Sequence, residues 1–153
     1  MALKLAQPYQ EKLFIATATA DDDEMKDRIE KHRKSRSRDW TVIEEPLDAG
    51  HVIERHSTET NVILLDCVTL LLSNLLGTHG RDGLDERIQS LCKSLNNAGG
   101  CVIVVTNEVG TGIVPVDPQT RFFRDKQGSF NKQLAAVADE VYLTCCGLPL
   151  RLK

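Results

Sequence analysis

The chain has 153 residues, which is enough for one domain with a substantial buried core. Hydrophobic residues make up 41% and charged residues 27%, and the formal net charge of −3 gives no general attraction to nucleic acid or to an anionic membrane surface. Aromatic residues make up only 5%, so we expect an aliphatic core, which suits parallel strands buried on both faces.

The apolar runs and the cysteines indicate a cytoplasmic protein. The longest apolar run, residues 62–76, is interrupted by polar side chains and is shorter than the roughly 18 residues of a membrane span. The first residues lack the apolar stretch of a secretory signal. The five cysteines have no C-x-x-C spacing and lie mostly in apolar runs, so we expect buried free thiols in a reducing compartment.

Short apolar strands alternate with helical patterns along the chain. Runs rich in aliphatic residues predict strands over residues 12–18, 40–44, 61–66 and 101–106. Apolar periodicity predicts helices over residues 24–34, 68–76, 84–97 and 119–138. A last strand over residues 139–144 is expected, with Leu148 to Leu150 continuing the edge of the sheet. This alternation predicts an α/β fold with a mostly parallel sheet and helices on both faces.

Ligands of parallel sheets bind at the carboxyl ends of the strands, and these ends carry polar residues here. Three of the four predicted ends carry carboxylates, among them Glu44 and Asp66. Asp66 is the last residue of the aliphatic strand NVILLD. In nucleoside-triphosphate enzymes, an acid at the end of such a strand holds Mg²⁺. The same residue could instead cap the helix that follows, and spacing alone does not separate the two interpretations.

A dense basic segment covers residues 28–38, with seven basic groups when His32 is included. On a helix, Arg28, His32 and Arg36 share one face, where guanidinium groups could clamp phosphate oxygens and the imidazole could supply a nucleophilic nitrogen. The alternative is a solvated basic helix end, favoured by the helix dipole, and the pattern alone favours this second interpretation. The segment is short and lacks interleaved aromatic residues, so no nucleic-acid role is expected.

The loop TNEVGTGIVP follows the strand that ends near residue 106. It matches neither G-x-G-x-x-G nor G-x-x-x-x-G-K-[ST], and alone it indicates only a tight loop with an acid at its entrance. His51, His56 and His79 lie in polar stretches without ligand spacing, and we expect them to be surface residues.

Four ordered segments together resemble one family. They are IATATADDDEMKDRIEKHRKSRSRDWTVIEEP, LLDCVTLLLSNLL, VVTNEVGTGIVP and RFFRDKQGSFNKQLAAVADEVYLTCCGLPLRLK. The family is adenosylcobinamide kinase/adenosylcobinamide-phosphate guanylyltransferase, of cobalamin biosynthesis, and the resemblance covers Lys12 to Lys153. It implies a three-layer, P-loop NTPase-like fold in a single nucleotidyl-transfer domain spanning residues 1–153.

The resemblance also implies a bifunctional transferase. Such an enzyme phosphorylates adenosylcobinamide with ATP or GTP and then moves GMP from GTP onto that phosphate through a guanylylated histidine. By position, this histidine is His32, and Mg²⁺ and a homo-oligomer are implied as well. The resemblance assigns nucleotide contacts to Thr17, Ala18, Thr19, Arg33, Lys34, Ser35, Arg36, Glu44 and Asp66. Asp66 would also take the metal role.

The first residues depart from the family pattern. Members begin with a strand and a phosphate loop of the form G-G-x-x-S-G-K-S, whereas Met1 to Ala6 resembles the end of the helix after that loop. We therefore expect an N-terminally truncated domain, without the first strand and the P-loop, that has little activity as it stands. The alternative is a non-catalytic paralogue that binds GTP or a corrinoid.

Overall fold

The computed structural model describes residues 1–20, 22–35 and 39–153, and at residues 32, 34 and 35 it describes the backbone alone. Over these residues, helices separate the strands of the first two thirds of the chain, largely as the sequence predicts. In chain order they are α1 (Ala2–Leu5), β1 (Glu11–Ala16), α2 (Asp23–Ser35), β2 (Trp40–Glu44), α3 (Ala49–His56), β3 (Asn61–Asp66), α4 (Val68–His79), α5 (Leu84–Asn96), β4 (Cys101–Val105), α6 (Pro118–Val137), β5 (Tyr142–Cys145) and β6 (Leu148–Arg151).

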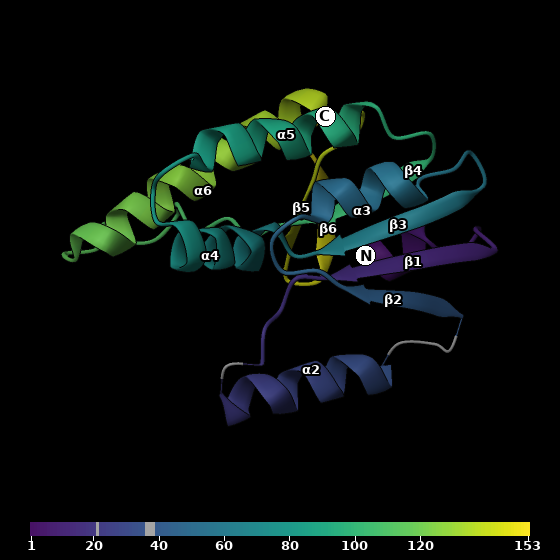
Figure 1. Ribbon diagram of the computed structural model, residues 1–153, viewed down its shortest axis with the longest axis horizontal. Coiled ribbons are helices and arrows are strands. Elements are labelled where there is room, and N and C mark those ends of the chain that lie inside the picture. The colour runs from purple at the N-terminus through teal and green to yellow at the C-terminus, as the bar shows by residue number, and fades with distance from the viewer. Residues whose placement is uncertain (21, 36–38) are drawn as a thin grey trace.

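The main sheet is parallel, which confirms the predicted fold class. Its described strands lie in the order β2-β1-β3-β4, and each neighbouring pair runs parallel. Figure 1 shows α3 and α5 together over one side of this sheet, while α2 lies apart from them, beside β2. Among the described helices, none has both the length and the apolar character needed to cross a membrane.

The core forms where alternate residues of β1 and β3 meet the helices. Leu13, Ile15, Ile63 and Leu65 belong to one buried cluster with side chains from α3, α4, α5 and α6. Because side chains alternate across a strand, these four residues share one face of the sheet. The first five residues of β3 are all buried, as expected for a strand in the middle of a parallel sheet. Full burial of each such side chain contributes about 1.5–3 kcal/mol.

Helix α3 is an element that the sequence pattern did not predict. Asp48 caps it, since its side chain accepts a hydrogen bond from the backbone N–H of His51 (3.2 Å). Val52 and Ile53 are buried, and Gly50 lies so close to α5 that a Cβ there would be 3.1 Å from the hydroxyl of Ser94. His51, His56 and His79 are exposed, as predicted.

The C-terminal strands correct the prediction that they extend the main sheet. β5 and β6 instead pair with each other, antiparallel, as a separate two-stranded hairpin. Cys145 and Cys146 lie at its turn and are exposed, whereas Cys67 and Cys92 are buried. The expectation of buried thiols is therefore confirmed for Cys67 and Cys92. It is wrong for Cys145 and Cys146, because the turn of a hairpin that is separate from the main sheet is not covered by other elements.

Candidate functional site

The carboxyl ends of the parallel strands bring the predicted site residues to one edge of the sheet. Ala16, the last residue of β1, is paired with Glu44 of β2 on one side and with Asp66 of β3 on the other. Asp66 is paired in turn with Val105 of β4. One row across the sheet therefore carries both predicted carboxylates, at the edge where such sheets bind ligands.

Thr17 ties the end of β1 to the turn that follows β3. Its hydroxyl donates to the carbonyl of Cys67 (2.8 Å) and accepts from the N–H of Cys67 (2.9 Å). The N–H of Thr17 donates to the carbonyl of Asp66 (3.2 Å), and the residue is completely buried. Thr17 thus fixes the conformation of the turn beside Asp66 by hydrogen bonding. Ala18 and Thr19, next along the chain, are half-buried.

We expect Thr17→Val to lower the free energy of unfolding by about 2–6 kcal/mol. Valine keeps the shape of threonine but leaves the N–H and the carbonyl of Cys67 without their partner, at about 1–3 kcal/mol for each buried group. Urea denaturation measures the change. Thr41→Val, at an exposed position on β2, is the matched control and should stay within about 0.5 kcal/mol of the wild type. Equal losses at both positions would show that the Thr17 hydroxyl does not hold the turn.

Asn74 of α4 is a residue of this edge that the sequence analysis missed. Its side-chain amide donates to the carbonyls of Thr17 (2.7 Å) and Pro46 (3.1 Å), so it joins α4 to the segments that leave β1 and β2. The available signal was an asparagine inside an otherwise apolar helical run. Such a residue needs a hydrogen-bonding partner, because a buried amide without one is costly.

Asp66 does not occupy the N-cap position of the helix that follows. The N-cap of α4 is Cys67, which makes no side-chain capping bond. Asp66 is half-buried at the end of its strand. Over the described residues, no three His, Cys, Asp or Glu side chains gather as metal ligands. A single strand-end carboxylate fits Mg²⁺ that arrives with a nucleotide, since that ion is held by one or two carboxylates plus phosphate oxygens and water.

The thiol of Cys67, next to Asp66, is not a competing nucleophile. Burial raises the pKa of this thiol above its usual value, and the negative charge of Asp66 acts in the same direction. The thiolate is the reactive form of cysteine, so Cys67 stays protonated and unreactive at neutral pH.

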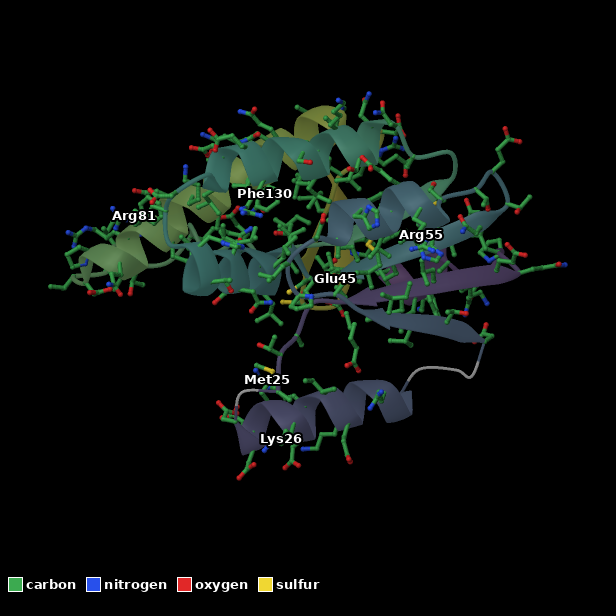
Figure 2. All side chains as sticks on the ribbon, viewed as in Figure 1. Met25, Lys26, Glu45, Arg55, Arg81 and Phe130 are labelled. Atoms are coloured by element: carbon green, nitrogen blue, oxygen red, sulfur yellow. The ribbon has the colours of Figure 1, made fainter. Side chains whose placement is uncertain are left out.

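The two adjacent glutamates at the end of β2 have different roles. Glu45 accepts hydrogen bonds from the N–H groups of Leu47 and Asp48, both at 2.9 Å, and so shapes the turn into α3. Glu44 points elsewhere and forms an ion pair with Arg33 of α2, with 3.3 Å between Oε1 and Nη2. Figure 2 places Glu45 where β2 ends and Met25 on the side of α2 toward the sheet.

Helix α2 carries the predicted basic cluster. The carboxylate of Asp22 accepts from the N–H of Met25 (2.7 Å), so an acidic residue begins the helix as expected. His32, Lys34 and Ser35 lie on α2, with side chains outside the description, and Arg36 lies outside the described residues. The Arg33–Glu44 ion pair, both of whose side chains are exposed, is a contact between the C-terminal part of α2 and the carboxyl edge of the sheet.

The loop after β4 is fixed by the two helices that flank it. The N–H of Asn107 donates to the hydroxyl of Thr69 on α4 (3.0 Å). From α6, Asn131 donates to the carbonyl of Asn107 (3.1 Å) and Arg124 to that of Gly110 (2.7 Å). Glu108 accepts from the N–H of Gly110 (2.7 Å). The glycine-rich loop therefore reaches the same edge in a defined conformation, held by residues of α6 for which the sequence analysis assigned no role.

An open parallel sheet with hydroxyl and carboxylate groups at its carboxyl edge is typical of α/β proteins that bind ligands at the strand ends, and it is consistent with a P-loop NTPase-like fold. Residues 1–152 match the family described as cobinamide kinase / cobinamide phosphate guanyltransferase. The chain belongs to this family, and it is an enzyme of this type, as the sequence resemblance predicted.

Three bacterial relatives are similar along almost the whole chain. The Escherichia coli bifunctional adenosylcobalamin biosynthesis protein CobU is 38% identical over 154 residues, covering 92% of this chain and 85% of the relative. The protein of that name from Salmonella typhimurium is 36% identical with the same coverage. The Pseudomonas aeruginosa bifunctional adenosylcobalamin biosynthesis protein CobP is 36% identical over 140 residues, covering 92% of this chain and 81% of the relative.

Proposed function

We propose that this chain phosphorylates the aminopropanol hydroxyl of adenosylcobinamide and then transfers GMP from GTP to that phosphate through a guanylylated His32. The observation that carries the proposal is the attachment of α2 to the carboxyl edge of the sheet. Arg33 follows His32 on that helix, and it forms an ion pair with Glu44, which lies in the same strand row as Asp66.

In the nucleotidyl-transfer step, His32 acts as the nucleophile and carries GMP. The neutral imidazole of His32 attacks the α-phosphorus of GTP, a P–N bond forms, and the bond to pyrophosphate breaks. A phosphate oxygen of the second substrate then attacks the same phosphorus, and the P–N bond breaks to release the histidine. An imidazole suits this role near pH 7, where much of it is unprotonated.

Charged residues at the carboxyl edge would bind the phosphates, directly or through Mg²⁺. Arg33 is a guanidinium with an exposed side chain, able to exchange its surface ion pair with Glu44 for phosphate oxygens, because exposed ion pairs are worth little. The Asp66 carboxylate would hold Mg²⁺ together with the phosphates. When bound, this ion supplies positive charge that neutralises the leaving pyrophosphate.

The motif content bears on the rate of this reaction and on a second candidate function. The 153 residues contain no G-x-x-x-x-G-K-[ST] loop, whose backbone N–H groups and lysine cradle phosphates in nucleotide enzymes. We propose that the 153-residue polypeptide therefore guanylylates itself slowly. The alternative is a non-catalytic protein that binds GTP or a corrinoid without turnover.

Labelling with GTP separates these proposals. The purified chain is incubated with Mg²⁺ and GTP carrying a radioactive α-phosphorus, beside the Escherichia coli relative as a positive control. We expect an acid-labile, base-stable label that forms about 100-fold more slowly than on the relative, the order of loss that follows removal of preorganised phosphate donors. Mass spectrometry of a reaction that contains adenosylcobinamide, ATP and GTP detects the phosphorylated and GDP-linked products.

Each outcome decides one part of the proposal. Labelling as fast as that of the relative would contradict slow guanylylation. GTP or cobinamide binding without any label or product would favour the non-catalytic alternative. No binding of either compound would contradict both.

A further inference from the structure

The hairpin of β5 and β6 turns through two residues with left-handed backbone conformations. Cys145 pairs with Leu148, so Cys146 and Gly147 form the turn, with φ values of 51° and 79°. Positive φ at both central residues is the type I′ geometry, for which Asn-Gly and Gly-Gly are the usual choices. A cysteine is therefore an unexpected residue at the first of these positions.

Cys146 departs from local preference without contributing to packing. Among the described residues it is the one non-glycine with a positive φ, a conformation in which the Cβ of an L-residue is crowded by its own backbone. Its side chain is exposed, as is that of Cys145, so burial does not offset the strain. Backbone strain that no packing explains is a signal of function.

The turn brings the two thiols side by side. Both are free, and their Sγ atoms are 3.9 Å apart. With metal–sulfur distances of about 2.3 Å, typical of zinc thiolates, two sulfurs 3.9 Å apart subtend an angle of about 115° at the ion, close to the tetrahedral value. The sulfurs are thus already spaced to hold one ion between them.

We propose that Cys145 and Cys146 form a two-thiolate site for a thiophilic metal ion of the Zn²⁺ class. Over the described part of the chain, no third His, Cys, Asp or Glu completes a metal-binding group here. The remaining coordination positions would be filled by water at the exposed hairpin tip. Each thiol loses its proton on binding, so affinity should increase with pH.

The test is a Zn²⁺ titration of the fully reduced chain in competition with a chromophoric chelator, under anaerobic conditions. We expect one equivalent to bind to the wild type. Cys145→Ser and Cys146→Gly should each weaken binding by about 100-fold. Removal of a residue that only contacts a metal ligand costs up to about 100-fold in affinity, so loss of a ligand itself should cost at least as much. Cys101→Ser, which removes the half-buried thiol of β4, is the matched control and should leave the affinity unchanged.

The Cys146→Gly variant also separates loss of the site from loss of the fold. Glycine adopts positive φ without strain, so this variant should melt no lower than the wild type while it loses the ion. Unchanged Zn²⁺ affinity in Cys145→Ser or Cys146→Gly would overturn the proposal, and so would an equal loss in Cys101→Ser. These results are independent of guanylylation, because none of the three thiols is among the residues proposed to bind the nucleotide or to carry GMP.

Discussion

Replacement of His32 by alanine is expected to abolish the covalent label that GTP leaves on the chain. The proposed intermediate is a P–N bond to this imidazole, so its removal should lower labelling by about 10³-fold or more, as loss of a nucleophile does in other covalent enzymes. The measurement is the amount of α-phosphorus label retained after denaturation and gel filtration, at protein concentrations high enough to detect slow labelling by the wild type.

Two further variants make the result specific. His32→Asn keeps a side chain that can hydrogen-bond but cannot form the phosphoramidate, and it should also be unlabelled. His51→Ala removes an exposed imidazole from α3 and should leave the label intact. Retention of label in both His32 variants would assign the nucleophile to another residue. Loss of label in His51→Ala would move the assignment to α3.

The second large effect is expected in the core, at Ile63. This residue is completely buried in β3, between the neighbouring strands β1 and β4. Ile63→Ala should lower the free energy of unfolding by about 2–5 kcal/mol, because it loses the transfer free energy of the deleted groups and leaves a cavity that the sheet cannot close. The shift of the urea midpoint, at an unchanged denaturant slope, measures this loss.

Ile113 provides a control of the same residue type in the loop after β4. Its side chain is 96% exposed, so Ile113→Ala should change the free energy of unfolding by no more than about 0.5 kcal/mol. Similar losses for the two alanine variants would mean that Ile63 is not part of the cooperative core. A destabilised Ile63→Ala chain should retain guanylylation at low temperature, where it remains folded.

The two interpretations of the basic segment make different demands on α2. A solvated helix end requires no contact with the sheet, whereas a phosphate-binding helix has to lie beside the strand ends. Arg33 is 3.3 Å from Glu44, so one residue of α2 meets the carboxyl edge, as a phosphate-binding helix requires, and the choice between the two interpretations stays a prediction. Because this ion pair is exposed, its contribution to stability is small, about 0–1 kcal/mol, and its position is the informative feature.

Most patterns that depend on near neighbours in the chain are confirmed, although the short helix α3 was not predicted. The strands Trp40–Glu44 and Asn61–Asp66 were predicted with their observed bounds, and the class of sheet followed from their apolar, turn-separated runs. Family membership, too, follows from the order of motifs along the chain. These features can be predicted because they leave a signal in neighbouring residues or in the order of segments. A strand that is buried on both faces, for example, is a continuous run of aliphatic residues.

Tertiary structure decided the partners of individual polar groups. Sequence order does not tell which of the adjacent Glu44 and Glu45 shapes a turn and which meets Arg33. The bonds of Thr17 to Cys67 and of Asn74 to two strand ends join residues far apart in the chain. A hydrogen bond is satisfied by whatever group lies within about 3 Å, and only the folded chain fixes that distance.

Tertiary structure also decided where the C-terminal strands pair. An apolar run predicts a strand but not its neighbour, since pairing depends on which sheet edge the preceding helix leaves within reach. Residues 142–145 and 148–151 pair with each other, and this leaves Cys145 and Cys146 exposed at a tight turn. The sequence by itself determined the fold class and the family, and it proposed residues for the carboxyl edge of the main sheet. The fold decided which of those residues hold the edge together and which thiols reach solvent, because both depend on contacts between distant segments.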